Sequence, residues 1–265
     1  MYKGDFQYLE NINEYRLSVV LMTDSFFYGI FDTNHCLVSH RSFTNVRFSS
    51  HSSIEQILMD EILKLNFLVK KIAIHTEQNY QLPDRDDEFL ALLPGLEFKS
   101  KKMEKLPGNR IYNYFGITKH QESLLVSLFE KNSYKLNGMP SLFCGYHLGD
   151  FDDFLHVHID TSVILLYIQK NSKMVFYNSF KFNGSNDILY FILAVCRYSG
   201  LDPMTCKIVL SGWIERDSIL FRHLAGYLGN LNIINDSQFK LSHKCNPECK
   251  KYHYFLHFMN NLCAL

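Results

Sequence analysis

LSVVLMTDSFFYGIF, residues 17–31, decides the fold of this chain. Both ends of the stretch are rich in β-branched and aromatic residues, which favour strands, and the short segment 22–25 separates them. The pattern predicts a β-hairpin. The elements expected next are a strand near 37–43, a helix capped by Ser52 or Ser53 with an apolar stripe from Ile54 to Leu65, and a strand at 71–75.

The second half of the chain repeats this order. Leu155, Val157 and Ile159 alternate with polar residues, as in a strand with one apolar face. The elements expected after it are strands at 163–169 and 174–180, a helix capped by Ser185 and ended by Ser199-Gly200, a strand at 206–210, a helix stopped by Gly229, and a strand at 231–234. Three strands, a helix and a strand, with a right-handed crossover in each half, predict an α/β protein in which 17–76 and 154–234 are related.

The segment between the halves contains less regular signals. Residues 83–87 are expected to form a charged loop, 110–117 a strand, and Thr118 and Gln121 a capping box before a helix. A turn at 137–140 places the boundary between an N-terminal subdomain, 1–140, and a C-terminal subdomain, 141–265. The tail 245–265 is expected to add a last strand or helix.

Composition excludes several classes of protein. The 27 basic and 27 acidic residues balance, so no overall field attracts nucleic acid or an anionic membrane. The longest apolar run, 188–196, is too short to span a bilayer, and the first residues do not form a signal peptide. Seven cysteines in such a chain indicate reduced thiols. We therefore expect a cytoplasmic protein without membrane insertion or nucleic-acid binding.

At three places the sequence resembles a known family. These are 17–21 leading into 28–32, then 175–180, and then 200–203 together with 209–212. The chain is similar there to an uncharacterised family of bacterial proteins, typical of the Bacteroidetes, with the fold of the actin-like ATPases. It is more remotely similar to the pilus-assembly branch of actin-like proteins. The resemblance spans nearly the whole chain. It implies two ribonuclease-H-like subdomains, each with a mixed sheet flanked by helices, around a central cleft, and it implies no activity.

The resemblance also says where phosphate-binding residues would lie. In actin-like ATPases an Asp ends the first strand and glycines form the turn, so that backbone amides approach phosphate and the carboxylate holds a hydrated metal ion. Leu21 occupies that Asp position here, and Tyr28 occupies the usual basic position. The turn contains Asp24 but no glycine. Asp24 is a candidate cleft residue, although a turn aspartate more often caps its own loop.

The second and third elements are altered as well. The resemblance places His158 where a carboxylate belongs and Asp160 where a glycine belongs, followed by Thr161. In the adenosine-contacting element Ser211 and Gly212 replace two adjacent glycines. The candidate cleft residues are therefore Asp24, His158, Asp160, Thr161, Ser211 and Gly212, and no residue is assigned a catalytic role.

Two groups of residues have metal-binding chemistry. His156, His158 and Asp160 share a strand face, and His147, Asp150, Asp152 and Asp153 lie just upstream. The tail contains His243, Cys245, Cys249 and His253. The tail spacing matches no common zinc pattern, and the strand histidines are typical of the polar side of a hairpin, so we expect no metal. Cys144, near His147, is expected to be a buried thiol and not a nucleophile.

These patterns favour a protein that acts by contact. We expect a non-catalytic scaffold or assembly module, a pseudoenzyme, which binds protein partners and needs no cofactor. The alternative is a divergent nucleotide-binding ATPase or small-molecule kinase that uses unusual cleft residues. Saturable binding of ATP or ADP would distinguish the two.

Overall fold

A computed structural model describes most of the chain, and the described residues divide into two compact units. Unit 1 contains those up to Gly145 and those within Phe239–Cys249 and Leu256–Leu265, and unit 2 contains the rest. Each unit is considered by itself. The described residues are 11–86, 88–89, 98–130, 133–145, 153–235, 237–242, 245 and 250–262.

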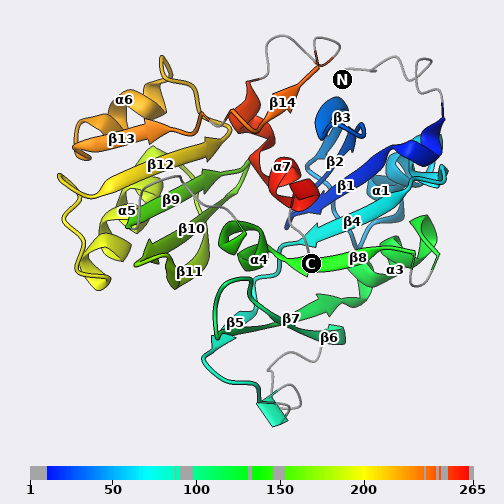
Figure 1. Cartoon of the computed structure of the whole chain (residues 1–265), viewed down its shortest axis with the longest axis horizontal. Helices are drawn as coiled ribbons and strands as arrows, with labels where there is room; N and C mark the ends of the chain where they lie inside the picture. Colours follow the sequence, from blue (N-terminus) through cyan, green and yellow to red (C-terminus); the bar gives the residue numbers. More distant parts are fainter. Residues whose placement is uncertain are drawn as a thin grey trace. The chain divides into compact units, whose positions relative to one another are not determined.

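Unit 1 is built on a six-stranded mixed sheet in the order β14-β3-β2-β1-β4-β8 (Figure 1). Strands β1, β2 and β3 are antiparallel neighbours, whereas β4 and β8 continue the sheet parallel to β1. The strands are β1 (Arg16–Leu21), β2 (Ser25–Phe31), β3 (Cys36–Thr44), β4 (Val69–Ile74), β8 (Lys135–Gly138) and β14 (Lys240–Leu241). The described α-helices are α1 (His51–Leu58), α3 (Lys119–Leu128), α4 (Met139–Cys144) and α7 (Phe255–Leu262), of which Phe255 is assigned to unit 2. Short 3-10 helices are η2 (Ile12–Glu14) and η3 (Glu61–Lys64).

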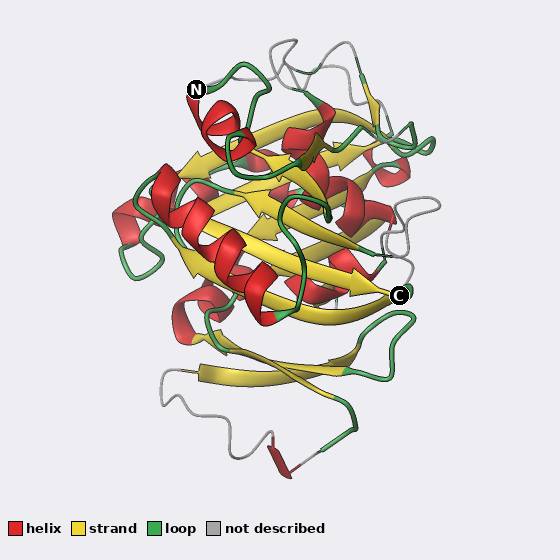
Figure 2. Ribbon diagram, turned by 90° about the vertical axis from the view of Figure 1, so that its left-hand side faces the viewer, coloured by secondary structure: helices red, strands yellow, loops and turns green. Residues whose placement is uncertain are grey.

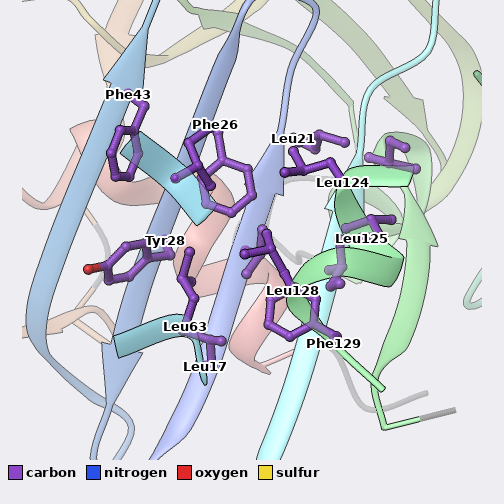
Figure 3. Close-up of a cluster of buried hydrophobic side chains, with 14 of the residues drawn as sticks. Leu17, Leu21, Phe26, Tyr28, Phe43, Leu63, Leu124, Leu125, Leu128 and Phe129 are labelled. Carbon is purple, nitrogen blue, oxygen red and sulfur yellow. The ribbon is translucent and has the colours of Figure 1, made fainter. Parts of the chain in front are cut away.

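The core of unit 1 lies between one face of this sheet and helices α1 and α3. Because side chains alternate along a strand, Leu17 and Leu21 of β1 point to the same face, where they meet Leu124 and Leu128 of α3 (Figure 3). Each of these four side chains is buried. Burying one such side chain contributes about 2 kcal/mol, so this face supplies much of the driving force for folding.

The opposite face of β1 is covered by α7. Asn260, which is fully buried, donates through Nδ2 to Ser18 Oγ (3.0 Å), to Lys71 O (2.9 Å) and to Val19 O (3.2 Å). His257 Nδ1 lies 3.1 Å from Ser18 Oγ. The tail therefore forms a helix with a polar underside, fixed to the backbone of β1 and β4.

Unit 2 repeats the topology of unit 1. Its five-stranded sheet has the order β11-β10-β9-β12-β13, which corresponds strand for strand to β3-β2-β1-β4-β8. The strands are β9 (Phe154–Ile159), β10 (Val163–Lys170), β11 (Lys173–Lys181), β12 (Lys207–Gly212) and β13 (Asn230–Ile233). The helices are α5 (Ser185–Tyr198), α6 (Ile219–Ala225) and the 3-10 helix η4 (Lys251–Tyr254). Figure 2 shows helices lying across the faces of the sheets.

A three-stranded sheet is inserted in unit 1 between β4 and α3. It consists of β5 (Asn79–Leu82), β6 (Phe98–Lys105) and β7 (Tyr112–Thr118), with β7 in the middle. The sequence predicted the strand at β7 alone. The predicted capping box after it is confirmed: Gln121 N donates to Thr118 Oγ1 (3.2 Å) and Thr118 N donates to Gln121 Oε1 (3.1 Å).

Several predicted element ends are wrong. Ser50 and not Ser52 or Ser53 is the N-cap of α1, and the helix stops at Leu58, where a 3-10 turn carries the apolar stripe onward. Gly184 precedes α5, so Ser185 is its first residue. The expected turn at 137–140 is the end of β8 followed directly by α4, which Pro140 can start because it sits in the first turn.

The end of α6 is also earlier than predicted. The helix stops at Ala225 with Gly226 as its C-cap, and Gly229 instead lies against the backbone of Met204, where a Cβ would clash. The division of the chain into subdomains 1–140 and 141–265 stays a prediction. The tail segment 256–262, which that division places in the second subdomain, packs in unit 1.

Candidate functional site

The first candidate residue, Asp24, lies in the turn between β1 and β2. Met22 N donates to Ser25 O (2.9 Å) to close the turn, and Val46 N donates to Asp24 O (2.7 Å). Ser25 Oγ donates to the Asp24 carboxylate (3.1 Å). None of the turn residues has a positive φ angle. Asp24 therefore binds within its own loop, as a turn aspartate commonly does.

A pocket of about 930 Å³ opens beside this turn, within unit 1. β1 and β4 are parallel neighbours, so their carboxyl ends meet at one edge, and the start of α3 adds a third wall. The lining residues are Thr23, Asp24, Val46, Arg47, Phe48, Ser49, His75, Thr76, Glu77, Gln78, Thr118, Lys119, His120 and Gln121.

Hydrogen bonds join several of the lining residues. His75 Nδ1 lies 3.1 Å from Thr23 Oγ1, and Gln121 Nε2 donates to His75 O (3.4 Å). Exposed Arg47 and Lys119 place positive charge among the lining residues. Of this lining, sequence reasoning selected only Asp24 as a candidate site residue, whereas it named Thr118 and Gln121 as a helix cap. The ends of two adjacent parallel strands were the signal that could have located the pocket.

Tyr28, at the position of the usual basic residue, is a structural residue of the core. Its side chain is fully buried, and its hydroxyl donates to Asp60 Oδ2 (2.9 Å), which also accepts from Arg41 (2.7 Å). Burial, together with the nearby Asp60 carboxylate, raises the pKa of Tyr28 well above its usual value of 10. Leu21, at the Asp position, is also buried. Neither side chain can bind a metal ion or balance phosphate charge.

In unit 2 the structure brings His158 and Ser211 together. They are opposite each other in the parallel ladder of β9 and β12, and His158 Nδ1 lies 2.8 Å from Ser211 Oγ. His156, on the same face of β9, approaches the same hydroxyl through Nε2, also at 2.8 Å. All three side chains are buried. A hydroxyl can donate one hydrogen bond and accept others, so Ser211 joins the two imidazoles.

Both histidines are neutral at physiological pH. Burial lowers the pKa of His158 to about 3. Burial also lowers the pKa of His156 well below 6.5, with a further contribution from His158. The ring of Phe255 covers the pair, with centroids 4.5 Å from His156 and 6.0 Å from His158. A neutral, covered imidazole does not replace the carboxylate that Mg²⁺ prefers.

Asp160 and Thr161 follow at the end of β9. Asp160 is buried and its N–H donates to Val163 O (3.0 Å), whereas Thr161 is exposed. This bond is the counterpart of the one from Met22 to Ser25. Asp160 therefore corresponds in the fold to Met22, and Asp24 corresponds to residue 162. The two candidate carboxylates do not occupy equivalent places in the two turns.

Gly212 ends β12 with φ +86°. A Cβ at this position would overlap the carbonyl oxygen of Ile159, which accepts a hydrogen bond from Trp213 N (2.8 Å). The close approach of β12 to β9 is thus enough to explain why this residue is glycine, and no ligand contact is needed to explain it.

The described residues contain no group of three or more His, Cys, Asp or Glu side chains placed to hold a metal ion. Cys245 Sγ contacts Leu37 O (3.1 Å) in unit 1, and His253 lies in unit 2, where it contacts Glu215 (3.1 Å) and stacks on Trp213. Asp153 accepts from Asn171 N (2.8 Å), and Cys144 is buried. The remaining residues considered as metal ligands, His147, Asp150, Asp152, His243 and Cys249, lie outside the described residues.

Residues 7–231 match the model of a family described as "Protein of unknown function (DUF3822)". No curated protein matches the chain. A Bacteroides thetaiotaomicron protein "with actin-like ATPase fold and unknown function" aligns with a TM-score of 0.68 and 18% identity, over 88% of this chain and 96% of that one. A chain of the "PilM-PilN type IV pilus biogenesis complex" aligns with a TM-score of 0.62 and 10% identity, over 93% and 97%.

A third solved structure, the cytoplasmic domain of EpsL from Vibrio cholerae, "an inner membrane component of the type II secretion system", has a TM-score of 0.51 and 6% identity, over 95% and 96%. The fold of the chain is that of the actin-like ATPases, and this prediction from the sequence is confirmed. Of the described helices, none has the length and apolar character needed to cross a bilayer.

Proposed function

The chain belongs to the DUF3822 family, and we propose that it is a non-catalytic assembly module of the bacterial cytoplasm that acts through contacts with protein partners. In this proposal the actin-like fold is kept as a scaffold, while the turns that would bind phosphate have lost that role. The module needs no cofactor and binds no nucleic acid.

One observation carries the proposal. Where the resemblance places the metal-binding carboxylate of unit 2, the chain has His158, held by Ser211 and covered by Phe255. Phosphate transfer requires preorganised charge that stabilises the transferring group, commonly a carboxylate-held metal ion. A buried, neutral imidazole supplies neither charge nor a ligand that Mg²⁺ prefers.

The first turn supports the same conclusion. It has no glycine and no positive φ angle, so its amides are not arranged as in glycine-rich phosphate loops. Leu21 and Tyr28 are buried in the core. Among the solved structures of this fold, PilM is named in a complex with PilN and EpsL as a component of a secretion system. Work in protein assemblies is thus compatible with the fold.

The pocket in unit 1 favours the second candidate, a divergent nucleotide-binding ATPase or small-molecule kinase. Its volume of about 930 Å³ lies in the range of small-molecule sites, and its lining combines Arg47 and Lys119 with Asp24. To bind and hydrolyse a nucleotide, the pocket would have to use the carboxylate of Asp24 in place of the strand-end carboxylate and the glycine-rich turn of actin-like ATPases. We therefore include Asp24 in the test.

The test measures nucleotide binding and turnover by the purified chain. We expect no saturable shift in Tm with ATP or ADP and Mg²⁺, and no phosphate release above a heat-treated control. A ligand at about 100 times its Kd would stabilise the protein by about 2.7 kcal/mol, which is readily seen. Turnover that is lost in Asp24→Ala or Asp160→Ala would replace the scaffold proposal with an unconventional active site.

A further inference from the structure

Strand β11 is the outermost strand on its side of the unit 2 sheet (Figure 1). Its counterpart in unit 1, β3, is not outermost. There the tail adds β14, whose Lys240 and Leu241 pair in parallel with Cys36 and Leu37. The fold thus accepts an added strand at this position in one unit, and the described part of unit 2 has no strand that corresponds to β14.

The edge at β11 is bordered by five aromatic side chains, here called the aromatic band. Phe180 of β11 stacks on Phe191 of α5 at 4.5 Å, and Phe176 of β11 contacts Tyr198 at 6.1 Å. The band comprises Phe176, Phe180, Tyr190, Phe191 and Tyr198.

The outer members of the band face solvent. Tyr198 is 81% exposed and Tyr190 is 66% exposed. On β11 itself, Val175 is 52% exposed. In β3, by contrast, the residues from Ser39 to Ser42 are polar. Exposed aromatic side chains beside an outermost strand supply both the backbone edge and the apolar contacts that strand addition uses.

The charged side chains within the β10–β11 hairpin are of one sign, and the two nearby carboxylates, Asp153 and Asp187, accept from the backbone N–H groups of Asn171 and Asn183. Residues 163–181, which cover β10, the turn and β11, contain three lysines and no Asp or Glu. Lys173 and Lys181 are exposed at the two ends of β11. If two copies of this chain paired antiparallel through β11, these lysines would approach each other, and like charges on paired strands are destabilising. Edge lysines also protect a strand from pairing with its own kind.

We propose that the outer edge of β11 binds an extended segment of a partner protein by strand addition, and that this segment has apolar residues at alternate positions and Asp or Glu at both ends. The backbone of the partner would extend the sheet. Its apolar side chains would cover the aromatic band, and its carboxylates would face Lys173 and Lys181. This inference rests on the proposed function, since it names the kind of partner that the module binds.

The test uses two displayed libraries of nine-residue peptides, the length of β11. In one library every peptide has Glu at both ends, and in the other every peptide has Lys at both ends. Between the ends of each peptide, apolar residues alternate with positions of random sequence. We expect enrichment from the Glu library only. The double variant Lys173→Glu, Lys181→Glu should reverse this preference.

Single variants locate the binding surface. Tyr190→Ser and Tyr198→Ser should each raise the Kd for an enriched peptide about tenfold, which is a loss typical of removing an aromatic side chain from the centre of an interface. The control is Tyr227→Ser, which removes another exposed aromatic side chain of unit 2, beyond the end of α6. Hydrogen exchange should slow at amides of β11 when the peptide binds, and not at β13, the opposite edge of the sheet.

Three results would overturn the proposal. One is equal enrichment from both libraries, or from neither. The second is binding without slower exchange at β11. The third is a dimer in solution that Val175→Lys disrupts, which would identify a second copy as the occupant. These results are distinguishable from those of the nucleotide test. ATP turnover by a protein that still binds the peptide would refute only the proposal of a non-catalytic module. Absence of peptide binding by a protein without ATP turnover would refute only the proposal of strand addition at β11.

Discussion

Gly212 lies directly opposite Ile159 in the parallel ladder of β9 and β12, with its backbone against the Ile159 carbonyl group. The residue after it donates to that same carbonyl. The resemblance to actin-like ATPases would assign this glycine to an adenosine contact. Its geometry instead assigns it to the joining of two strands, and the two roles predict different effects of substitution.

Gly212→Ala should destabilise the protein by about 3 kcal/mol or more, because alanine is strained at φ +86° and its Cβ overlaps backbone atoms. Chemical unfolding measures this loss without any ligand. The matched control is Gly184→Ala in the same unit, where a Cβ meets no atom within 4 Å and the effect should be small. Unchanged stability of the Gly212→Ala variant would contradict the structural role.

The pair His156 and His158 should make the protein sensitive to acid. Burial lowers both pKa values, so the folded protein keeps these histidines neutral while the unfolded chain takes up protons near pH 6.5. Their contribution is therefore complete above about pH 6.5 and is lost as the pH falls, for His158 toward about pH 3. Between pH 7 and pH 5 we expect a loss of about 2 kcal/mol from His158, and a further loss in the same direction from His156.

His158→Asn tests this, because an Asn side chain can keep the hydrogen bond to Ser211 without titrating. Denaturant midpoints at pH 7 and pH 5 should lie closer together in this variant than in the wild type. His120→Asn, at an exposed position, serves as the control. An acid sensitivity that is the same in wild type and His158→Asn would show that other groups cause it.

Glu104 should have the opposite effect on stability. Its carboxylate accepts from Asn113 Nδ2 (2.8 Å) and from Gly138 N (3.0 Å), and burial raises its pKa to about 7. The folded state then holds a proton that the unfolded chain releases near 4.5. Stability from this group is complete below about pH 4.5 and declines up to about pH 7, by about 3 kcal/mol.

Glu104→Gln should remove this decline, since an amide retains an acceptor for Gly138 N. The measurement is the unfolding free energy at several values between pH 5 and pH 8. Glu61→Gln changes an exposed carboxylate and provides the comparison. A decline that persists in Glu104→Gln would place its origin elsewhere.

Asn260→Leu should release α7 from the sheet of unit 1. The change keeps the side-chain volume but removes the hydrogen bonds from Asn260 Nδ2 to Ser18 Oγ, Val19 O and Lys71 O. Each such hydrogen bond contributes about 1 kcal/mol, so a loss of about 3 kcal/mol is expected. Met259→Leu, which alters a neighbouring buried residue but no hydrogen bond, should cost less than about 1.5 kcal/mol. Equal losses of unfolding free energy in the two variants would show that the hydrogen bonds of Asn260 do not hold α7 on the sheet.

The two hairpins could be predicted because their signals are local. Residues 17–31 and 163–181 alternate strand and turn chemistry within a few residues, and Thr118 with Gln121 forms a capping box that needs no distant partner. By contrast, the sequence of β6 is FKSKKMEK, in which the lysines and the glutamate are residues that are uncommon in strands. It becomes a strand because β7 supplies a partner, which sequence pattern alone does not reveal.

The candidate site could be predicted only in part, because local motifs identify single residues but not the residues that the fold brings beside them. Motif comparison selected His158 and Ser211 separately, and only the parallel pairing of β9 with β12 shows that they share a hydrogen bond. The pocket beside Asp24 was missed because its walls come from segments near residues 23, 47, 75 and 120. The sequence predicted that the tail adds a last strand or helix, but it did not reveal the polar contacts of α7, because the partners of Asn260 include backbone groups of β1 and β4.

The bond between Asn260 and Ser18 joins residues 242 positions apart in the chain. On a ribosome, β1 therefore emerges long before the helix that covers one of its faces exists. The sheet of unit 2 is complete once residue 233 has emerged, whereas unit 1 must wait for residues up to 262. The half that is synthesised first is thus the half that is finished last, and its uncovered strand face has to be protected from other nascent chains in the interval.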